Sequence, residues 1–139
     1  MSARARQKLR ESREEEAYIL RKRLIAIYDQ MLAEGRFELS RDLDFQVVTK
    51  EIDGKKTRVA KLKGNKILVS VNGSTLPTSA LKYIIAHEIA HKFTKKHSDR
   101  FWRVIENLYP SYKRGQALLN ERYSPSSGLD SDQRKQMMQ

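Results

Sequence analysis

The sequence contains no cysteine among its 139 residues. This excludes a disulfide framework and any zinc site built on thiolates, and it suits a reducing compartment. No apolar run approaches the roughly 20 residues that a membrane-spanning helix needs. The basic N-terminal hexapeptide is not followed by an apolar stretch. We therefore expect no signal peptide, no membrane association and a cytoplasmic location.

Acidic residues are scarce relative to basic ones: 17 Asp and Glu face 28 Lys and Arg, for a net charge of +11. A small protein this basic attracts polyanions, and nucleic acid is the first candidate. Charge alone does not separate a nucleic-acid surface from a surface that serves solubility, so both interpretations stay open. The length allows one domain with a modest core.

Proline and glycine are absent between the N-terminus and Gly35, which predicts one long helix over residues 3–35. Residues 1–16 are almost wholly polar, and we assign them to a polar helical extension. Apolar residues then recur at three- and four-residue steps, so the rest of the helix should pack on the core of a domain spanning 17–123. The extension could be a nucleic-acid or partner arm or a solvated helix end, and we favour the solvated end.

Short alternating stretches predict a three-stranded antiparallel meander. Residues 45–49 and 57–62 alternate between apolar and polar, and they flank Asp53-Gly54, the dipeptide most typical of a two-residue hairpin. Gly64-Asn65 makes a second turn into the aliphatic run Ile67 to Val71.

A buried central helix should follow this sheet. It is expected from Thr78 to Phe93 or Lys95, opened by Pro77 and capped by Thr75 or a neighbouring hydroxyl residue. Its apolar residues cover much of its circumference, which is typical of a helix surrounded by protein.

Two further helices are expected before the end of the chain. Ser98 or Asp99 caps the first, which Pro110 ends, and residues 112–121 form the second. Residues 124–139 are polar, and we expect them to form a disordered tail that contributes nothing to the core.

The central helix carries the residues that could bind a metal or catalyse a reaction, His87-Glu88-Ile89-Ala90-His91. Histidines four residues apart share one helical face, so both imidazoles can reach one metal ion. Glu88 is offset by one residue and can act as a general base on a water held by that metal. Zinc lowers the pKa of such a water from about 15.7 toward 7.

His97 is the predicted third ligand. It follows His91 by six residues, beyond the expected helix end, so the chain can turn it back toward the metal. Three protein ligands and one open position are typical of a catalytic zinc. A chance match is the alternative, but all 3 histidines of the chain fall within this window, and two buried imidazoles without a partner would be costly. We predict one zinc ion per chain.

Other residues near this window have more than one interpretation. Asp99 could orient a zinc-bound imidazole, although we favour a helix cap. Phe101 and Trp102 should belong to the core. A basic cluster near the site could favour acidic or DNA-bound substrates or could be a solvated face: Lys92, Lys95 and Lys96. The candidates for an oxyanion donor are several arginines and four tyrosines, Tyr83, Tyr109, Tyr112 and Tyr123.

The stretches 83–91, 97–102 and 109–113 resemble the YgjP-like metallopeptidases. They are similar, more distantly, to the SprT and Spartan group, which digests proteins crosslinked to DNA. The resemblance covers about residues 57–121. It is specific, because the third histidine, the Phe-Trp pair and the Tyr-Pro-x-Tyr segment accompany the short zinc motif. It implies an α+β, zincin-like fold: a long N-terminal helix, a small antiparallel sheet, an active-site helix and one or two further helices.

The resemblance also implies roles for individual residues. It assigns zinc ligation to His87, His91 and His97 and the base role to Glu88. Family members usually carry an Arg-Trp-Gly-Ser-Cys segment where this chain has residues 58–64, without Trp or Cys.

The metzincin group has the same histidine spacing but does not fit this sequence. Metzincins need a glycine where this chain has Thr94, and a methionine turn beneath the metal. The downstream methionines here, Met137 and Met138, lie in the polar tail.

Three functions follow from these observations. The first is a zinc endopeptidase acting on proteins or peptides, with DNA-associated proteins as one substrate class, and with the substrate added as a strand to a sheet edge near Ile67 to Val71. The second is a zinc-stabilised nucleic-acid-binding module without activity, against which Glu88 and the missing fourth ligand argue. The third is a latent enzyme whose open zinc position is covered by the tail or by the acidic run 14–16.

Overall fold

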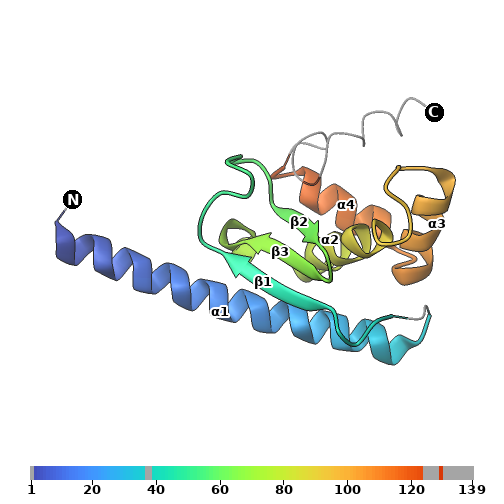
Figure 1. The fold of residues 1–139 in the computed structure, drawn as a ribbon, viewed down its shortest axis with the longest axis horizontal. Helices are drawn as coiled ribbons and strands as arrows, with labels where there is room; N and C mark the ends of the chain where they lie inside the picture. The colour runs from blue at the N-terminus through green and yellow to red at the C-terminus, as the bar shows by residue number, and fades with distance from the viewer. Residues whose placement is uncertain (1, 37–38, 124–128, 130–139) are drawn as a thin grey trace.

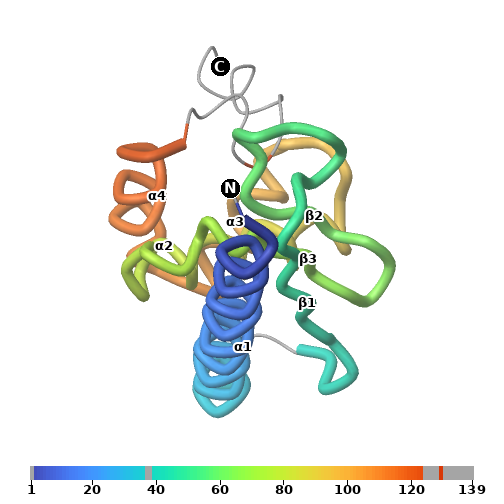
Figure 2. The backbone as a smooth tube through the Cα atoms, turned by 90° about the vertical axis from the view of Figure 1, so that its left-hand side faces the viewer, coloured from blue at the N-terminus to red at the C-terminus, as the bar shows by residue number. Residues whose placement is uncertain are grey.

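The computed structural model describes residues 2–36, 39–123 and 129. The fold is α+β, as the sequence predicted: a three-stranded sheet follows the long first helix, and the other helices come after it (Figure 1). Figure 2 shows the sheet on one side of the molecule and α2 and α4 on the other. The elements are α1 (Ala3–Glu34), β1 (Asp44–Val48), β2 (Ala60–Lys63), β3 (Lys66–Ser70), the 3-10 helix η1 (Val71–Thr75), α2 (Thr78–Ala90), α3 (Asp99–Leu108) and α4 (Tyr112–Asn120).

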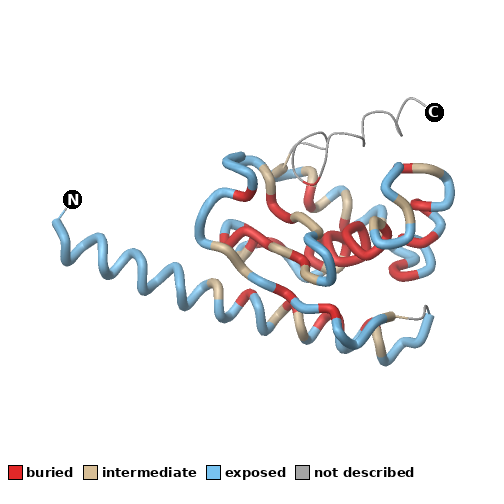
Figure 3. The backbone as a smooth tube through the Cα atoms, in the orientation of Figure 1, coloured by how far each residue is buried: buried red, intermediate tan, exposed pale blue. Residues whose placement is uncertain are grey.

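Helix α1 confirms the long helix predicted at the N-terminus. It starts where the Ser2 hydroxyl accepts a hydrogen bond from the N–H of Ala5 at 3.1 Å, and it ends at Gly35, whose φ of 62° is left-handed. Buried residues occur from Leu20 to Met31, whereas residues 2–16 are all exposed. The first half of α1 therefore projects from the body of the molecule (Figure 3).

The strand order is β1-β3-β2, which corrects the predicted meander. Strand β1 runs parallel to β3, and β2 runs antiparallel to it, so β1 and β2 are not partners. Asp53 and Gly54 form the expected turn, with φ of 55° and 69°, but the turn closes only a bridge between Ile52 and Lys55. The hairpin pattern is local, whereas the central place goes to β3, which carries the buried Ile67 and Val69.

Helix α2 is buried along nearly its whole length, as predicted, and it contacts α4, α3, α1 and β2. It ends earlier than expected, at Ala90, with His91 as its C-cap, and Phe93 beyond it is 41% exposed. Its N-cap is Pro77, with no side-chain cap. The hydroxyl of Thr75, predicted as a cap, instead accepts a hydrogen bond from Arg122.

Helices α3 and α4 close the fold on the far side of α2. The Ser98 hydroxyl caps α3 by accepting from the N–H of Phe101 at 3.4 Å. Most of the predicted tail lies outside the described residues, but Leu129 is 1% exposed and belongs to the core. The expectation that residues after 123 add nothing to the core is therefore wrong. Within the described residues, no helix has both the length and the apolarity that a membrane crossing requires.

Candidate metal centre

The three histidines converge at the C-terminal end of α2. His87 lies in the last turn of the helix, His91 is its C-cap, and His97 lies in the loop before α3. One ligand atom from each lies within 4.8 Å of the others, and Nε2 of His91 is 3.2 Å from Nε2 of His97. The residues that the sequence singled out are therefore brought together.

This arrangement fits a zinc ion. Zinc–nitrogen bonds of about 2.0–2.1 Å in a tetrahedron place two ligand nitrogens about 3.3 Å apart, close to the observed 3.2 Å between His91 and His97. His87 is fully buried and His97 is nearly so. Within the described part of the chain, the group contains three donors and no fourth His, Cys, Asp or Glu. Three nitrogen donors leave one position for a water or substrate, as in catalytic sites.

A tight turn carries the chain from His91 back to His97. The N–H groups of Lys92 and Phe93 bond to the carbonyls of Ile89 and Ala90 at 2.9 and 3.1 Å, which ends the helix within one turn. The Ser98 cap then starts α3 directly after His97. His97, the predicted third ligand, is thus fixed between two helix ends.

Phe101 is the apolar neighbour that all three imidazoles share. Its ring centroid lies 5.1, 4.8 and 4.5 Å from those of His87, His91 and His97. Phe101 is fully buried, as predicted, and it restricts how the histidine rings can rotate. An aromatic ring of α3 thus packs against the three histidines.

Glu88 lies on the same helix but faces differently from the two histidines. It is 2% exposed, and its Oε2 atom is 3.7 Å from Nδ1 of His87. This oxygen has no hydrogen-bond partner among the described residues. A buried carboxylate oxygen is costly to leave in this state, whereas a metal ion and its water would compensate it. The unsatisfied oxygen is thus a second feature of the site that fits a bound metal ion and its water.

Aromatic rings form a closed circuit beside the histidines, which the sequence did not reveal. Tyr112 lies 6.4 Å from Tyr83 and 5.9 Å from Trp102, measured between ring centroids. Tyr83 contacts His87 at 5.8 Å, Trp102 contacts His97 at 6.1 Å, and the two histidines are 5.3 Å apart. The circuit joins α2, α3 and α4 around one side of the site.

The tyrosines predicted as candidate oxyanion donors have different surroundings in the structure. The Tyr83 hydroxyl is fully buried and accepts a hydrogen bond from Gln116 at 3.2 Å. The Lys82 ammonium group lies over the Tyr109 ring, 4.9 Å from the centre of that ring. Tyr112 is half-buried within the circuit, and burial, with the charge of Glu106, raises the pKa of its hydroxyl.

The remaining sequence candidates lie on the surface of the site region. Ser98 caps α3, and Asp99 is exposed in its first turn, where a negative charge suits the helix dipole. Lys92, Lys95 and Lys96 are all exposed. The Lys92 ammonium group bonds to the side chain of Asn65, which connects the β2–β3 turn to the residue after His91.

A buried His-Glu-x-x-His helix packed on a small sheet, with a third histidine from the following loop, is the arrangement that the resemblance to zincins implies. A family model described as YgjP-like, metallopeptidase domain, matches residues 3–122, and the chain belongs to this family. No curated protein and no solved structure matches the chain. The match covers all of α1, including the exposed first half.

Proposed function

We propose that the protein is a zinc endopeptidase in which His87, His91 and His97 hold the metal and Glu88 is the general base. The observation that carries this proposal is the convergence of three histidine nitrogens within 4.8 Å beside a buried carboxylate. Membership of a metallopeptidase family supports it. The non-enzymatic alternative gives a buried Glu88 no role.

The chemistry follows from the side chains around the histidines. A bound zinc ion supplies a Lewis acid that acidifies a water and polarises the substrate carbonyl. Glu88 removes the proton from the attacking water and delivers it to the leaving amine. The Tyr112 hydroxyl, half-buried and protonated, is the donor we assign to the developing oxyanion.

The substrate edge predicted near Ile67 to Val71 is wrong, because β3 has a strand on each side. The outer edge of β1 is also engaged: the Arg21 guanidinium donates to the carbonyl of Phe45 at 2.9 Å. Strand β2 is the other edge of the sheet. We therefore place an extended substrate along β2.

The register of β2 identifies the groups that would bind it. The backbone N–H of Ser70 donates to the Val59 carbonyl at 2.8 Å, so residue 59 directs its backbone groups toward β3. Because this direction alternates along a strand, residues 60 and 62 direct theirs to the outer edge. The Ala60 carbonyl accepts from Arg58 at 3.2 Å. The backbone of Leu62 is then the main anchor for an added peptide strand. The contact between Lys92 and Asn65 holds this strand's end beside the metal centre.

The substrates that we propose are proteins, including proteins bound to nucleic acid. The net charge of +11 supports the second class, because it would keep the enzyme near polyanions. Acidic or DNA-bound substrates would also meet the exposed Lys95 and Lys96 beside the site.

The test is the Glu88→Gln variant, assayed on an unfolded protein such as casein. General-base removal should lower cleavage by about 10²- to 10⁴-fold while the zinc content stays at the wild-type level. Glu51→Gln, at an exposed position in the loop between β1 and β2, makes the same charge change and should retain activity. Mass spectrometry of the products should show internal cuts. Undiminished cleavage by zinc-loaded Glu88→Gln would contradict the mechanism.

A further inference from the structure

A groove of about 230 Å³ lies where the projecting half of α1 passes the end of β1. Its walls are Arg6, Leu9, Arg10 and Arg13 from α1 and Thr49 from the segment after β1. The guanidinium of Arg13 donates to the Thr49 carbonyl at 3.5 Å, so the two walls touch. The groove shares no residue with the metal centre.

Its three arginines share one face of the helix. They are spaced four and three residues apart, which places them in a line at 3.6 residues per turn. Arg13 and Arg6 are one and two heptads before Leu20, so they continue the stripe that is buried further along α1. The stripe that contacts the core thus becomes a row of cations where the body of the molecule ends.

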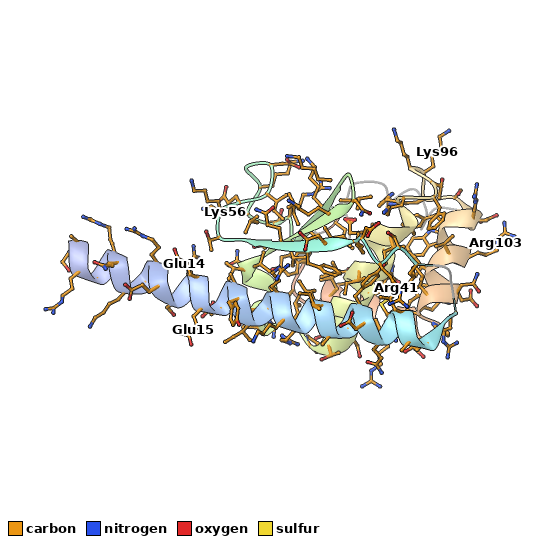
Figure 4. The ribbon with its side chains drawn as sticks, turned by 60° about the horizontal axis from the view of Figure 1, so that its bottom comes forward. Glu14, Glu15, Arg41, Lys56, Lys96 and Arg103 are labelled. Carbon is orange, nitrogen blue, oxygen red and sulfur yellow. The ribbon has the colours of Figure 1, made fainter. Side chains whose placement is uncertain are left out.

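The acidic residues of this half of α1 do not line the groove. Glu11 accepts a hydrogen bond from the Gln7 amide at 3.2 Å, and Glu14 borders a neighbouring groove that also contains Arg21. Figure 4 shows Glu14 and Glu15 at the inner end of the projecting segment. The groove itself therefore has a concentrated positive charge.

The loop between β1 and β2 adds to this charge. It carries the exposed Lys50, Lys55 and Lys56. Figure 4 shows Lys56 on the side of the molecule from which the N-terminal half of α1 projects, and Lys96 on the opposite side. Of the loop's two acidic residues, Asp53 is paired with the Lys61 ammonium group at 2.9 Å, which leaves Glu51.

We propose that the arginine groove binds the phosphodiester backbone of nucleic acid without reading its bases. Guanidinium groups bind phosphate through paired hydrogen bonds, and three in a row suit a chain of phosphates. The groove has no aromatic side chain on which a base could stack. This activity goes beyond the proposed peptidase and does not depend on it.

An anionic membrane is the competing partner for a basic helix, but the composition of residues 2–16 disfavours membrane binding. An interfacial helix buries a continuous apolar face. Residues 2–16 contain one large apolar side chain, Leu9. Binding of phosphates by the arginines accounts for the basic charge of residues 2–16 and needs no apolar face.

The experiment measures binding to fluorescent DNA by anisotropy, on full-length protein carrying Glu88→Gln so that cleavage does not interfere. The probes are a random-sequence duplex and a single strand, titrated across about 50 to 300 mM salt. The groove variant is Arg6→Gln, Arg10→Gln and Arg13→Gln together. The matched control, Arg4→Gln, Lys8→Gln and Lys22→Gln, removes the same charge from the opposite face of α1. Glutamine preserves helix propensity, which circular dichroism verifies.

The groove variant should bind about 10- to 100-fold more weakly at 0.1 M salt, and its salt slope should fall by about 2 to 3, because each phosphate contact contributes about 0.9. The control should change affinity less than about threefold. Equal losses in both variants would overturn the groove as the site. No DNA binding by the parent protein, or binding only to phosphatidylserine vesicles, would overturn nucleic acid as the partner. None of these outcomes depends on peptidase activity.

Discussion

Gly115 of α4 lies so close to Tyr83 of α2 that a Cβ atom at residue 115 would be 2.8 Å from the Cβ of Tyr83 and 2.3 Å from the carbonyl oxygen of Ser79. The hydrogen bond from Gln116 to the Tyr83 hydroxyl reinforces this crossing. The two helices can therefore approach only with glycine at this position. The approach places Tyr112, one turn earlier on α4, beside the site.

Gly115→Ala should destabilise the protein, although alanine usually stabilises a helix interior by about 1 kcal/mol relative to glycine. The added methyl group would push α4 away from α2, and overpacking of this kind costs about 1–3 kcal/mol. Urea denaturation measures the change. Lys113→Ala, at an exposed position of the same helix, should stay within about 0.5 kcal/mol of the wild type. A stabilised Gly115→Ala variant would show that the crossing is looser than described.

Tyr112→Phe keeps the ring in its aromatic circuit and removes the hydroxyl. If this hydroxyl donates to the oxyanion, kcat should fall about 10²- to 10³-fold with little change in KM or zinc content. Because burial raises the pKa of Tyr112, the hydroxyl keeps its proton at neutral pH and its donor role should not titrate there. Tyr109→Phe, on the Lys82 side, is the control. Similar kinetics for the two variants would remove Tyr112 from the mechanism.

Asp44 should make the stability of the protein depend on acid pH. A hydrogen bond from the Phe45 N–H at 2.8 Å and one from the Arg21 guanidinium at 3.1 Å lower the pKa of this carboxyl below its ordinary 3.8. The stabilisation is therefore present above that value and disappears as pH falls through the lowered folded-state pKa.

Asp44→Asn should cost about 0.5 kcal/mol at pH 7, since the pair with Arg21 is solvent-exposed. The gap from the wild type should narrow in unfolding curves measured progressively below pH 4. In an Arg21→Gln background the same substitution should cost less. A cost that is constant with pH would mean that the charge of Asp44 contributes nothing.

Local patterns in the sequence predicted that His87, His91 and His97 would converge. The four-residue spacing of His87 and His91 needs only a helix, and His97 needs only a helix end before it. Both requirements can be read from the neighbouring residues, and the structure brings the three nitrogens together. The Ser98 cap and the bounds of α1 and α4 depend on equally local signals.

Long-range contacts were not accessible from these patterns. The Asp53-Gly54 turn forms, yet it does not reveal the partner of β1. Strand β1 pairs with β3 and not with β2, which follows it in the sequence. Leu129 stands between Gly128 and Asp130 in a largely polar segment, and only the packed core shows that it is buried. The arginine groove also depends on the packing of α1 beside β1 and cannot be read from charge alone.

Metal content tests the central claim most directly. It would be measured by inductively coupled plasma mass spectrometry on protein purified without chelators or metal-affinity resin, for the wild type, Glu88→Gln and His97→Ala. We predict about one zinc per chain in the first two proteins and much less in His97→Ala, which loses a ligand but keeps His87 and His91. No zinc in the wild type, and none taken up on dialysis against zinc, would contradict the three-histidine site and the peptidase function built on it.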